Sequence, residues 1–256
     1  MRVVFQRVVA AGALVAVVGV LAGCGTKRAA GEDAAGGAAP SYTACMVTDT
    51  GGIDDSGFNG AAWAGLQAAQ AAGAATVSYV QSRTEADYAT NIASLQSQGC
   101  KTIVTVGGLM ADATAAAAKA SPGTKFIEVD APGNGTNIRG IQYNTAEAGF
   151  LAGYLAAGYS KSGKVATWGG LKIAPVTVFM DGFAEGIAYY NSRKGTSVQL
   201  LGWDEASQNG SFSGSFDDQS KGQQFATNFI AQGADVLFPV AGDAGLGTAS
   251  VAMTSG

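Results

Sequence analysis

The chain has 256 residues, of which 47% are hydrophobic and 13% are charged, and its formal net charge at pH 7 is −4. A mildly acidic chain with no basic run in its main body does not fit nucleic-acid binding, which requires a basic surface. The sequence contains no histidine. This excludes Ser-His-Asp and Cys-His catalysis and removes the commonest metal ligand.

Residues 1–23 have the pattern of a signal peptide. Arg2 and Arg7 supply positive charge, and residues 8–20 form an apolar run that is short for a membrane span. The run ends in Leu21-Ala-Gly-Cys24, which is similar to a bacterial lipobox. The similarity implies a lipid on the Cys24 thiol, which would anchor the protein at the extracytoplasmic face of the cell membrane. The alternative is an ordinary secretory signal with an incidental cysteine.

Residues 24–41 are rich in Gly and Ala and show no periodicity, so we expect a flexible tether. About 215 residues follow, which is enough to bury a core in one or two domains.

In this main body, short apolar runs rich in β-branched residues alternate with helical patterns. The alternation is typical of an α/β fold with mainly parallel sheets flanked by helices. A junction near residues 143–150 predicts two lobes, an N-terminal lobe over 42–146 and a C-terminal lobe over 147–256. Strands are expected at about 43–48, 75–80, 102–106, 125–129, 138–143, 164–168, 197–201 and 235–239. Helices are expected at about 57–72, 85–98, 110–120, 145–160, 176–192, 219–232 and 245–254, the fourth opened by an Asn144–Glu147 capping pair.

The segment 46–59 is expected to run from a strand through a glycine turn into a helix. Gly51 and Gly52 suit a turn that needs positive φ, and residues 54–56 suit the helix start. The following helix is expected to present one face made of Phe58, Ala62, Leu66 and Ala69.

Ligands of open α/β sheets bind beyond the carboxyl ends of the strands. Asp49, Thr50, Phe58 and Asn59 are therefore expected near a ligand mouth. A carboxylate can accept from two sugar hydroxyl groups, and aromatic faces can hold a flat ring.

Further acids and aromatic residues are expected at other strand ends. The acids are Asp112 and Asp130, and the aromatic residues are Trp168, Phe179 and Phe238. For each aromatic side chain, core packing is the alternative interpretation. Gly242 begins a strand-to-helix turn whose backbone is expected to approach a ligand. Adjacent acids such as Asp54 and Asp55 fit helix starts better than catalysis, so we predict no enzyme, no metal site and no cofactor.

Cys45 and Cys100 lie at the starts of two strands that should be parallel neighbours. An exported chain with these two remaining cysteines predicts a disulfide between them. Two free buried thiols are the alternative.

The stretch from Val47 to Asn59 resembles the N-terminal signature of the basic membrane lipoprotein family. This family contains the purine nucleoside receptor A-like substrate-binding lipoproteins of ABC importers. Residues 150–157, 168–183 and 238–242 resemble later stretches of the same family in the same order.

The resemblance implies a two-lobed periplasmic-binding fold of type I that captures a nucleoside, by family a purine nucleoside, for an ABC permease and its ATPase. Asp49, Phe58 and Asn59 match the family's ligand-binding signature, and Met110, Asp130 and the 238–242 strand end fall at similar positions. The alternatives are a sugar or signalling ligand on the same fold, or a surface sensor that takes no part in transport.

In the resembling family, another strand follows the position of the last helix of this chain. The C-terminal lobe is thus expected to be incomplete, and the chain to be a fragment less stable than a form longer by roughly 80–100 residues.

Overall fold

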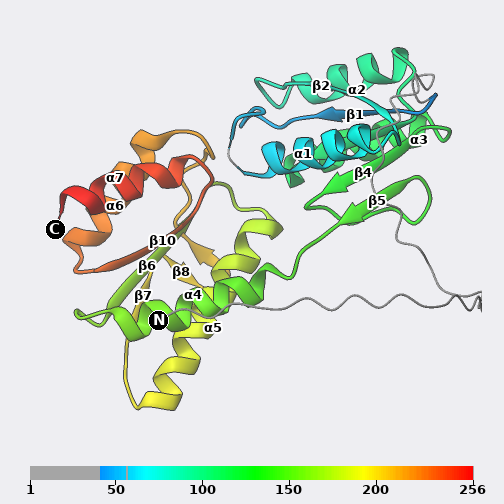
Figure 1. Ribbon diagram of the computed structural model, residues 1–256. Coiled ribbons are helices and arrows are strands. Elements are labelled where there is room, and N and C mark those ends of the chain that lie inside the picture. Colours follow the sequence, from blue (N-terminus) through cyan, green and yellow to red (C-terminus); the bar gives the residue numbers. More distant parts are fainter. Residues whose placement is uncertain (1–40, 56, 256) are drawn as a thin grey trace, which may run out of the picture. The chain divides into compact units, whose positions relative to one another are not determined.

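The computed structural model describes residues 41–255 except Ser56. The predictions for the signal peptide, for Cys24 and for nearly all of the tether lie outside these residues. The described chain forms two main parallel β-sheets with helices on their faces, which confirms the predicted α/β architecture (Figure 1). Within this part of the chain, no helix combines the length and apolar character that crossing a membrane requires.

The first sheet has the strand order β2-β1-β3-β4-β5, and all of its pairings are parallel. Cys45 and Val47 belong to a core beneath two helices, whereas Met46 belongs to a core beneath another helix, as the alternation of a strand requires. The strands are β1 (Thr43–Val47), β2 (Thr76–Val80), β3 (Thr102–Val106), β4 (Lys125–Val129) and β5 (Ile138–Ile141). The helices are α1 (Phe58–Ala71), whose side chains join the Met46 core, and α2 (Asp87–Ser97) and α3 (Ala111–Ala120), which join the Cys45 core.

The second sheet has the order β10-β6-β7, again with parallel pairing. One apolar core joins it to two helices that follow the first sheet, and another joins it to the last two helices. The strands are β6 (Lys164–Gly169), β7 (Gln199–Leu201) and β10 (Val236–Val240), and the helices are α4 (Thr145–Tyr159), α5 (Ala174–Lys194), α6 (Gln219–Ala231) and α7 (Ala244–Thr254).

Helices α4 and α5 pack with their backbones close together. A Cβ atom on Gly153 would lie 2.1 Å from the carbonyl oxygen of Phe183, and one on Gly186 would lie 2.1 Å from that of Phe150. Only glycine fits at these two positions, so the pair forms a tightly packed layer on the sheet.

The structure adds short elements that the sequence does not predict. A one-turn 3₁₀-helix η1 (Gly108–Met110) follows β3, and β8 (Trp203–Asp204) pairs antiparallel with β9 (Asn209–Gly210). These pieces are too short to carry a hydrophobic period. Helix α5 begins at Ala174 rather than at 176, with a proline in its first turn, where a missing N–H costs no intrahelical bond.

The predicted Asn144–Glu147 pair is present at the start of α4, where Asn144 is the N-cap residue, but its side chain does not cap the helix backbone. Asn144 makes no side-chain bond to the helix backbone. Its Nδ2 instead donates to Oε1 of Glu147 at 2.7 Å, so the amide and the carboxylate bond directly to each other.

The predicted disulfide is present. Cys45 and Cys100 are bonded, with 5.9 Å between their Cα atoms. β1 and β3 are parallel neighbours, so the link ties the middle of β1 to a residue two positions before β3.

Candidate functional site

The carboxyl ends of the parallel strands bring separate loops of the chain together at one edge of the first sheet. Asp49 follows β1, Gly107 follows β3 and Asp130 follows β4. A Cβ atom on Gly107 would lie 2.9 Å from Oδ2 of Asp49, and Gly107 has φ of 102°. Glycine therefore allows the β3 end to approach the Asp49 carboxylate closely.

The two oxygens of the Asp49 carboxylate differ in their bonds to the described part of the chain. Oδ1 accepts from the Gly51 N–H at 2.9 Å and from Asn59 Nδ2 at 2.6 Å. No hydrogen bond reaches Oδ2 from the residues that the structure describes. Asp49 thus has a fixed orientation and retains a free acceptor.

The carboxyl groups at this edge have raised pKa values. Burial raises the pKa of Asp49, while the bonds from Asn59 and Gly51 lower it in part. Burial also raises the pKa of Asp130, and the charge of Asp49 raises it further. Asp130 has φ of 68°, a left-handed conformation that residues other than glycine adopt rarely. The edge therefore holds two partly desolvated, electrostatically coupled carboxyl groups, an arrangement common in binding sites.

A buried tyrosine lies close to Asp49. Tyr88 of α2 is 2% exposed, and no described group lies in hydrogen-bonding geometry with its hydroxyl. Burial raises the pKa of Tyr88 to about 12, with the charge of Asp49 as the next cause and weak interactions with Thr50 acting in the opposite direction. Thr50 itself is half-buried beside Asp49.

Asp55 caps the first turn of α1. Its Oδ1 accepts from the Gly57 and Gly60 N–H groups at 2.8 and 3.0 Å, and its Oδ2 accepts from the N–H and Nδ2 of Asn59, both at 3.0 Å. The predicted acidic helix start is present, although the residue preceding the helix is Gly57. Asn59 is 1% exposed, so its amide group is shielded from solvent.

The predicted apolar face of α1 is confirmed except at its first residue, Phe58. Ala62, Trp63 and Leu66 pack against the core, whereas 47% of Phe58 is exposed. Asn59 is the buried residue of this first turn instead, bonded to Asp49 and Asp55. Phe58 consequently presents an uncovered ring beside the strand end.

The structure places the next two predicted residues differently from each other. Met110 is 0% exposed and belongs to the core under α2 and α3. Asp112 lies in the first turn of α3 and is exposed. Met110 therefore contributes packing beneath the edge, and Asp112 lies at its surface.

In the second sheet, two predicted aromatic side chains are engaged in ring stacking. Trp168 is 0% exposed and stacks on Phe225 at a centroid distance of 4.9 Å. Phe238 stacks on Phe183 at 4.6 Å. Both rings therefore pack in the core, which is the alternative to ligand binding that the sequence leaves open for each of them. Phe179 is half-buried on α5, and its carbonyl oxygen lies 2.4 Å from where a Gly149 Cβ would be, so this turn is pressed against α4.

Phe216 occupies the strand ends of the second sheet, and the sequence analysis missed it. A Cβ on Gly170, after β6, would lie 2.3 Å from the Phe216 ring, and one on Gly242, after β10, would lie 3.1 Å from its carbonyl oxygen. Gly242 is exposed with φ of 52°. Phe216 is half-buried in a segment that docks on β6 through the Gly169–Phe212 bridge. The two strand-end glycines were the only signal that could have indicated this space.

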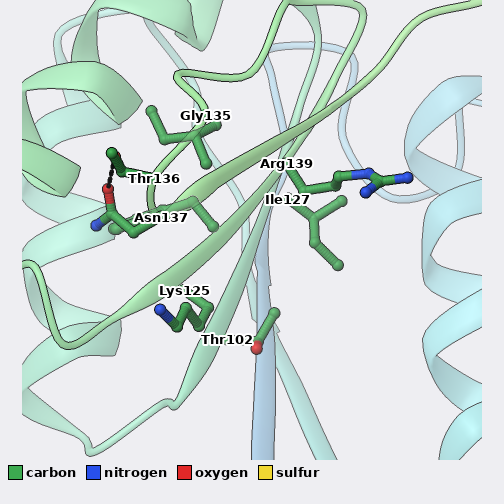
Figure 2. Close-up of a pocket in the computed structure, with 9 residues that line it drawn as sticks. Thr102, Lys125, Ile127, Gly135, Thr136, Asn137 and Arg139 are labelled. Atoms are coloured by element: carbon green, nitrogen blue, oxygen red, sulfur yellow. Dashed lines mark hydrogen bonds between the residues drawn. The ribbon is translucent and has the colours of Figure 1, made fainter.

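A separate pocket lies away from these residues. It has a volume of about 380 Å³ and lies toward the amino ends of β3 and β4, whereas Asp49 and Asp130 follow the carboxyl ends (Figure 2). Figure 2 shows Thr102, Lys125, Ile127 and Arg139 on its strands. Within the described chain, no three Cys, Asp or Glu side chains are arranged to hold a metal ion.

Comparison with known proteins gives consistent results. Residues 42–256 match the profile of the Bmp family, described as "ABC transporter substrate-binding protein PnrA-like". The chain is 33% identical over 253 residues to the ABC transporter nucleoside-binding protein BmpA of Lactococcus lactis, covering 96% of this chain and 68% of that protein. It is 32% identical over 237 residues to a CD4+ T-cell-stimulating antigen of Listeria innocua, covering 89% of this chain and 62% of that protein.

Among solved structures, a solute-binding protein of an ABC transporter system from Aeropyrum pernix superposes with a TM-score of 0.70 at 25% identity. The match covers 84% of this chain and 59% of that protein. An arabinose-binding protein from Geobacillus stearothermophilus, at 19% identity and a TM-score of 0.64, shares the fold. The chain thus spans between 59% and 68% of the length of the first relatives in each comparison.

Proposed function

Because this chain belongs to the Bmp family of PnrA-like ABC transporter substrate-binding proteins, we propose that it captures a nucleoside, preferably a purine nucleoside, for an ABC importer. The family binds its ligands without converting them, which agrees with a sequence that has no histidine. The L. lactis relative is named as nucleoside-binding, which supports the choice of ligand.

The observation that carries the proposal is the free Oδ2 of Asp49 at the carboxyl edge of the first sheet, close enough to Asp130 for their charges to interact. Two carboxylates at one edge can accept hydrogen bonds from the adjacent hydroxyl groups of a ribose. A ligand of this kind brings donors rather than negative charge, so it does not oppose the acids.

The base of the nucleoside requires a flat apolar surface. Phe58 offers an exposed ring beside Asp49 on the first sheet, and Phe216 is half-buried at the strand ends of the second. We propose that these two rings hold the base, since aromatic faces stack well on planar heterocycles. Phe238 and Trp168 are left out of this set because their rings already stack in the core.

Ligand capture is proposed to close the two lobes of the protein, because groups of both lobes contact one ligand and favour the closed form. The lobe boundaries at 42–146 and 147–256 remain predictions. We also propose a lipid on Cys24 that holds the protein at the outer face of the membrane beside the permease, on the strength of the lipobox-like sequence.

A melting screen of purine nucleosides, pyrimidine nucleosides, ribose and simple sugars tests this function, followed by calorimetry of the strongest ligand. We expect purine nucleosides to raise the Tm most, because a ligand that binds only the folded state stabilises it by mass action. A larger shift with a free sugar than with any nucleoside would overturn the ligand assignment.

A further inference from the structure

The amide side chain of Asn59 has no donor left for a ligand. Its Nδ2 carries two hydrogens. One reaches Asp49 Oδ1 at 2.6 Å and the other reaches Asp55 Oδ2 at 3.0 Å. Its Oδ1 accepts from the Asp49 N–H at 3.2 Å, and the residue is 1% exposed.

The orientation of this amide is fixed by its neighbours. If Oδ1 and Nδ2 were exchanged, an oxygen would face two carboxylate oxygens with no proton between them, and an NH₂ group would face the Asp49 N–H. Asp55 in turn is held by the first-turn N–H groups of α1. A continuous chain of hydrogen bonds therefore runs from the start of α1, through Asp55 and Asn59, to Asp49.

We infer that Asp55 and Asn59 are positioning residues, which hold the Asp49 carboxylate so that Oδ2 faces the ligand, and that neither side chain contacts the ligand. The inference rests on the proposed function and replaces the expectation that Asn59 binds ligand directly. It assigns Asp55, which the sequence indicates only as part of a helix start, a part in ligand affinity.

A double-mutant cycle tests the coupling, measured by calorimetry with the purine nucleoside that binds best. Asp55→Asn should weaken binding by about 5- to 30-fold, since a carboxamide cannot accept all four bonds and releases Asn59. In an Asp49→Asn background the same change should alter affinity less than twofold, because the residue it positions is already lost. Equal losses in both backgrounds would overturn the inference.

Asp54→Asn is the matched control. Asp54 is exposed, none of the described residues bonds to its side chain, and the substitution removes the same charge one position away. Its affinity should stay within twofold of wild type. A loss as large as that of Asp55→Asn would mean that net charge, not positioning, explains the effect.

A ligand-free measurement separates this inference from the proposed function. The pKa of Asp49, followed by carboxyl NMR titration, should rise in Asn59→Ala, because the Asn59 bond lowers it in the wild type. The other charges acting on this group, those of Asp55 and Asp217, are retained, as is its coupling to Asp130 and Tyr88.

An unchanged pKa of Asp49 in folded Asn59→Ala would overturn the positioning role, whatever ligand binds. Conversely, if wild-type protein bound no nucleoside while the pKa rose, the proposed function would fail and the positioning role would stand.

Discussion

Asp49 and Asn59 are joined by two hydrogen bonds that run in opposite directions. Asn59 Nδ2 donates to Asp49 Oδ1 at 2.6 Å, and the Asp49 N–H donates to Asn59 Oδ1 at 3.2 Å. The pair locks the end of β1 to the first turn of α1 across the segment between Asp49 and Asn59. A rigid carboxylate with one free oxygen is the result, and pre-organisation of this kind reduces the entropy lost on binding.

Asp49→Ala should abolish high-affinity ligand binding while the fold survives. Loss of a charge-assisted acceptor should cost about 2–4 kcal/mol of binding free energy, or roughly 30- to 1,000-fold in Kd. Calorimetry with the best nucleoside measures the change, and circular dichroism checks the fold. Unchanged affinity in a folded variant would remove Asp49 from the site.

Phe58→Ala should weaken nucleoside binding far more than binding of free ribose. The ring is 47% exposed and proposed to stack on the base, which ribose lacks. Competition titrations with both ligands give the comparison, and Trp63→Phe, which changes a ring on the core-facing side of α1, serves as control. Equal losses for nucleoside and ribose would show that Phe58 acts only through packing.

Glu128 of β4 should make the protein less stable as the pH rises. Its side chain is 1% exposed, and Oε1 has no hydrogen-bond partner among the described groups. Burial raises the pKa of Glu128 from 4.5 to about 7, against smaller opposing effects of the Thr114 and Thr105 hydroxyls. Between pH 4.5 and 7 the folded state thus binds more protons than the unfolded state. The stability that Glu128 contributes through this difference is complete below pH 4.5 and is lost as the pH rises through 7.

Glu128→Gln should flatten this dependence and be more stable than wild type at pH 8 by roughly 1–3 kcal/mol. Urea unfolding at pH 5 and pH 8 measures it. Asp49 and Asp130 also have raised pKa values, so a shallower slope of the same sign should remain. Identical slopes in variant and wild type would contradict the role of Glu128.

Gly153→Ala should destabilise the second sheet by about 1–3 kcal/mol, because a methyl group 2.1 Å from the Phe183 carbonyl forces α4 and α5 apart. Gly65→Ala on α1 is the control. Its Cβ would meet nothing within 4 Å, and the change should stabilise α1 by about 0.5–1 kcal/mol. Denaturant unfolding of both variants tests the contrast, and the same effect for both would refute tight α4–α5 packing.

The Cys45–Cys100 disulfide should contribute up to about 4 kcal/mol of stability, because it closes a loop of 55 residues in the unfolded chain. Alkylation in denaturant without reductant, followed by peptide mass mapping, should leave both cysteines unlabelled. Reduction should then lower the unfolding midpoint. Labelling of both residues before reduction would show that the link is not formed in the protein.

The sequence by itself was sufficient for the regular elements. Buried parallel strands require unbroken apolar runs, so β1, β3 and β4 were predicted within one residue of their observed ends. The Cys45–Cys100 pair could also be predicted, since strand neighbours in a parallel sheet follow from the alternation of strands and helices. The position of Asp49 at a strand end followed in the same way.

Tertiary structure decided how the polar and aromatic side chains of the site are used. Whether Phe238 faces a ligand or the core depends on Phe183, which is distant in sequence and stacks on it. Phe216 reaches the strand ends only because its segment folds back along Gly169, and no local periodicity encodes such a return. Likewise, Asn59 is a ligand candidate in sequence but is buried between two carboxylates in space. Periodicity reports which face of an element is apolar, whereas hydrogen-bond partners are fixed by long-range packing that brings separate loops to one edge.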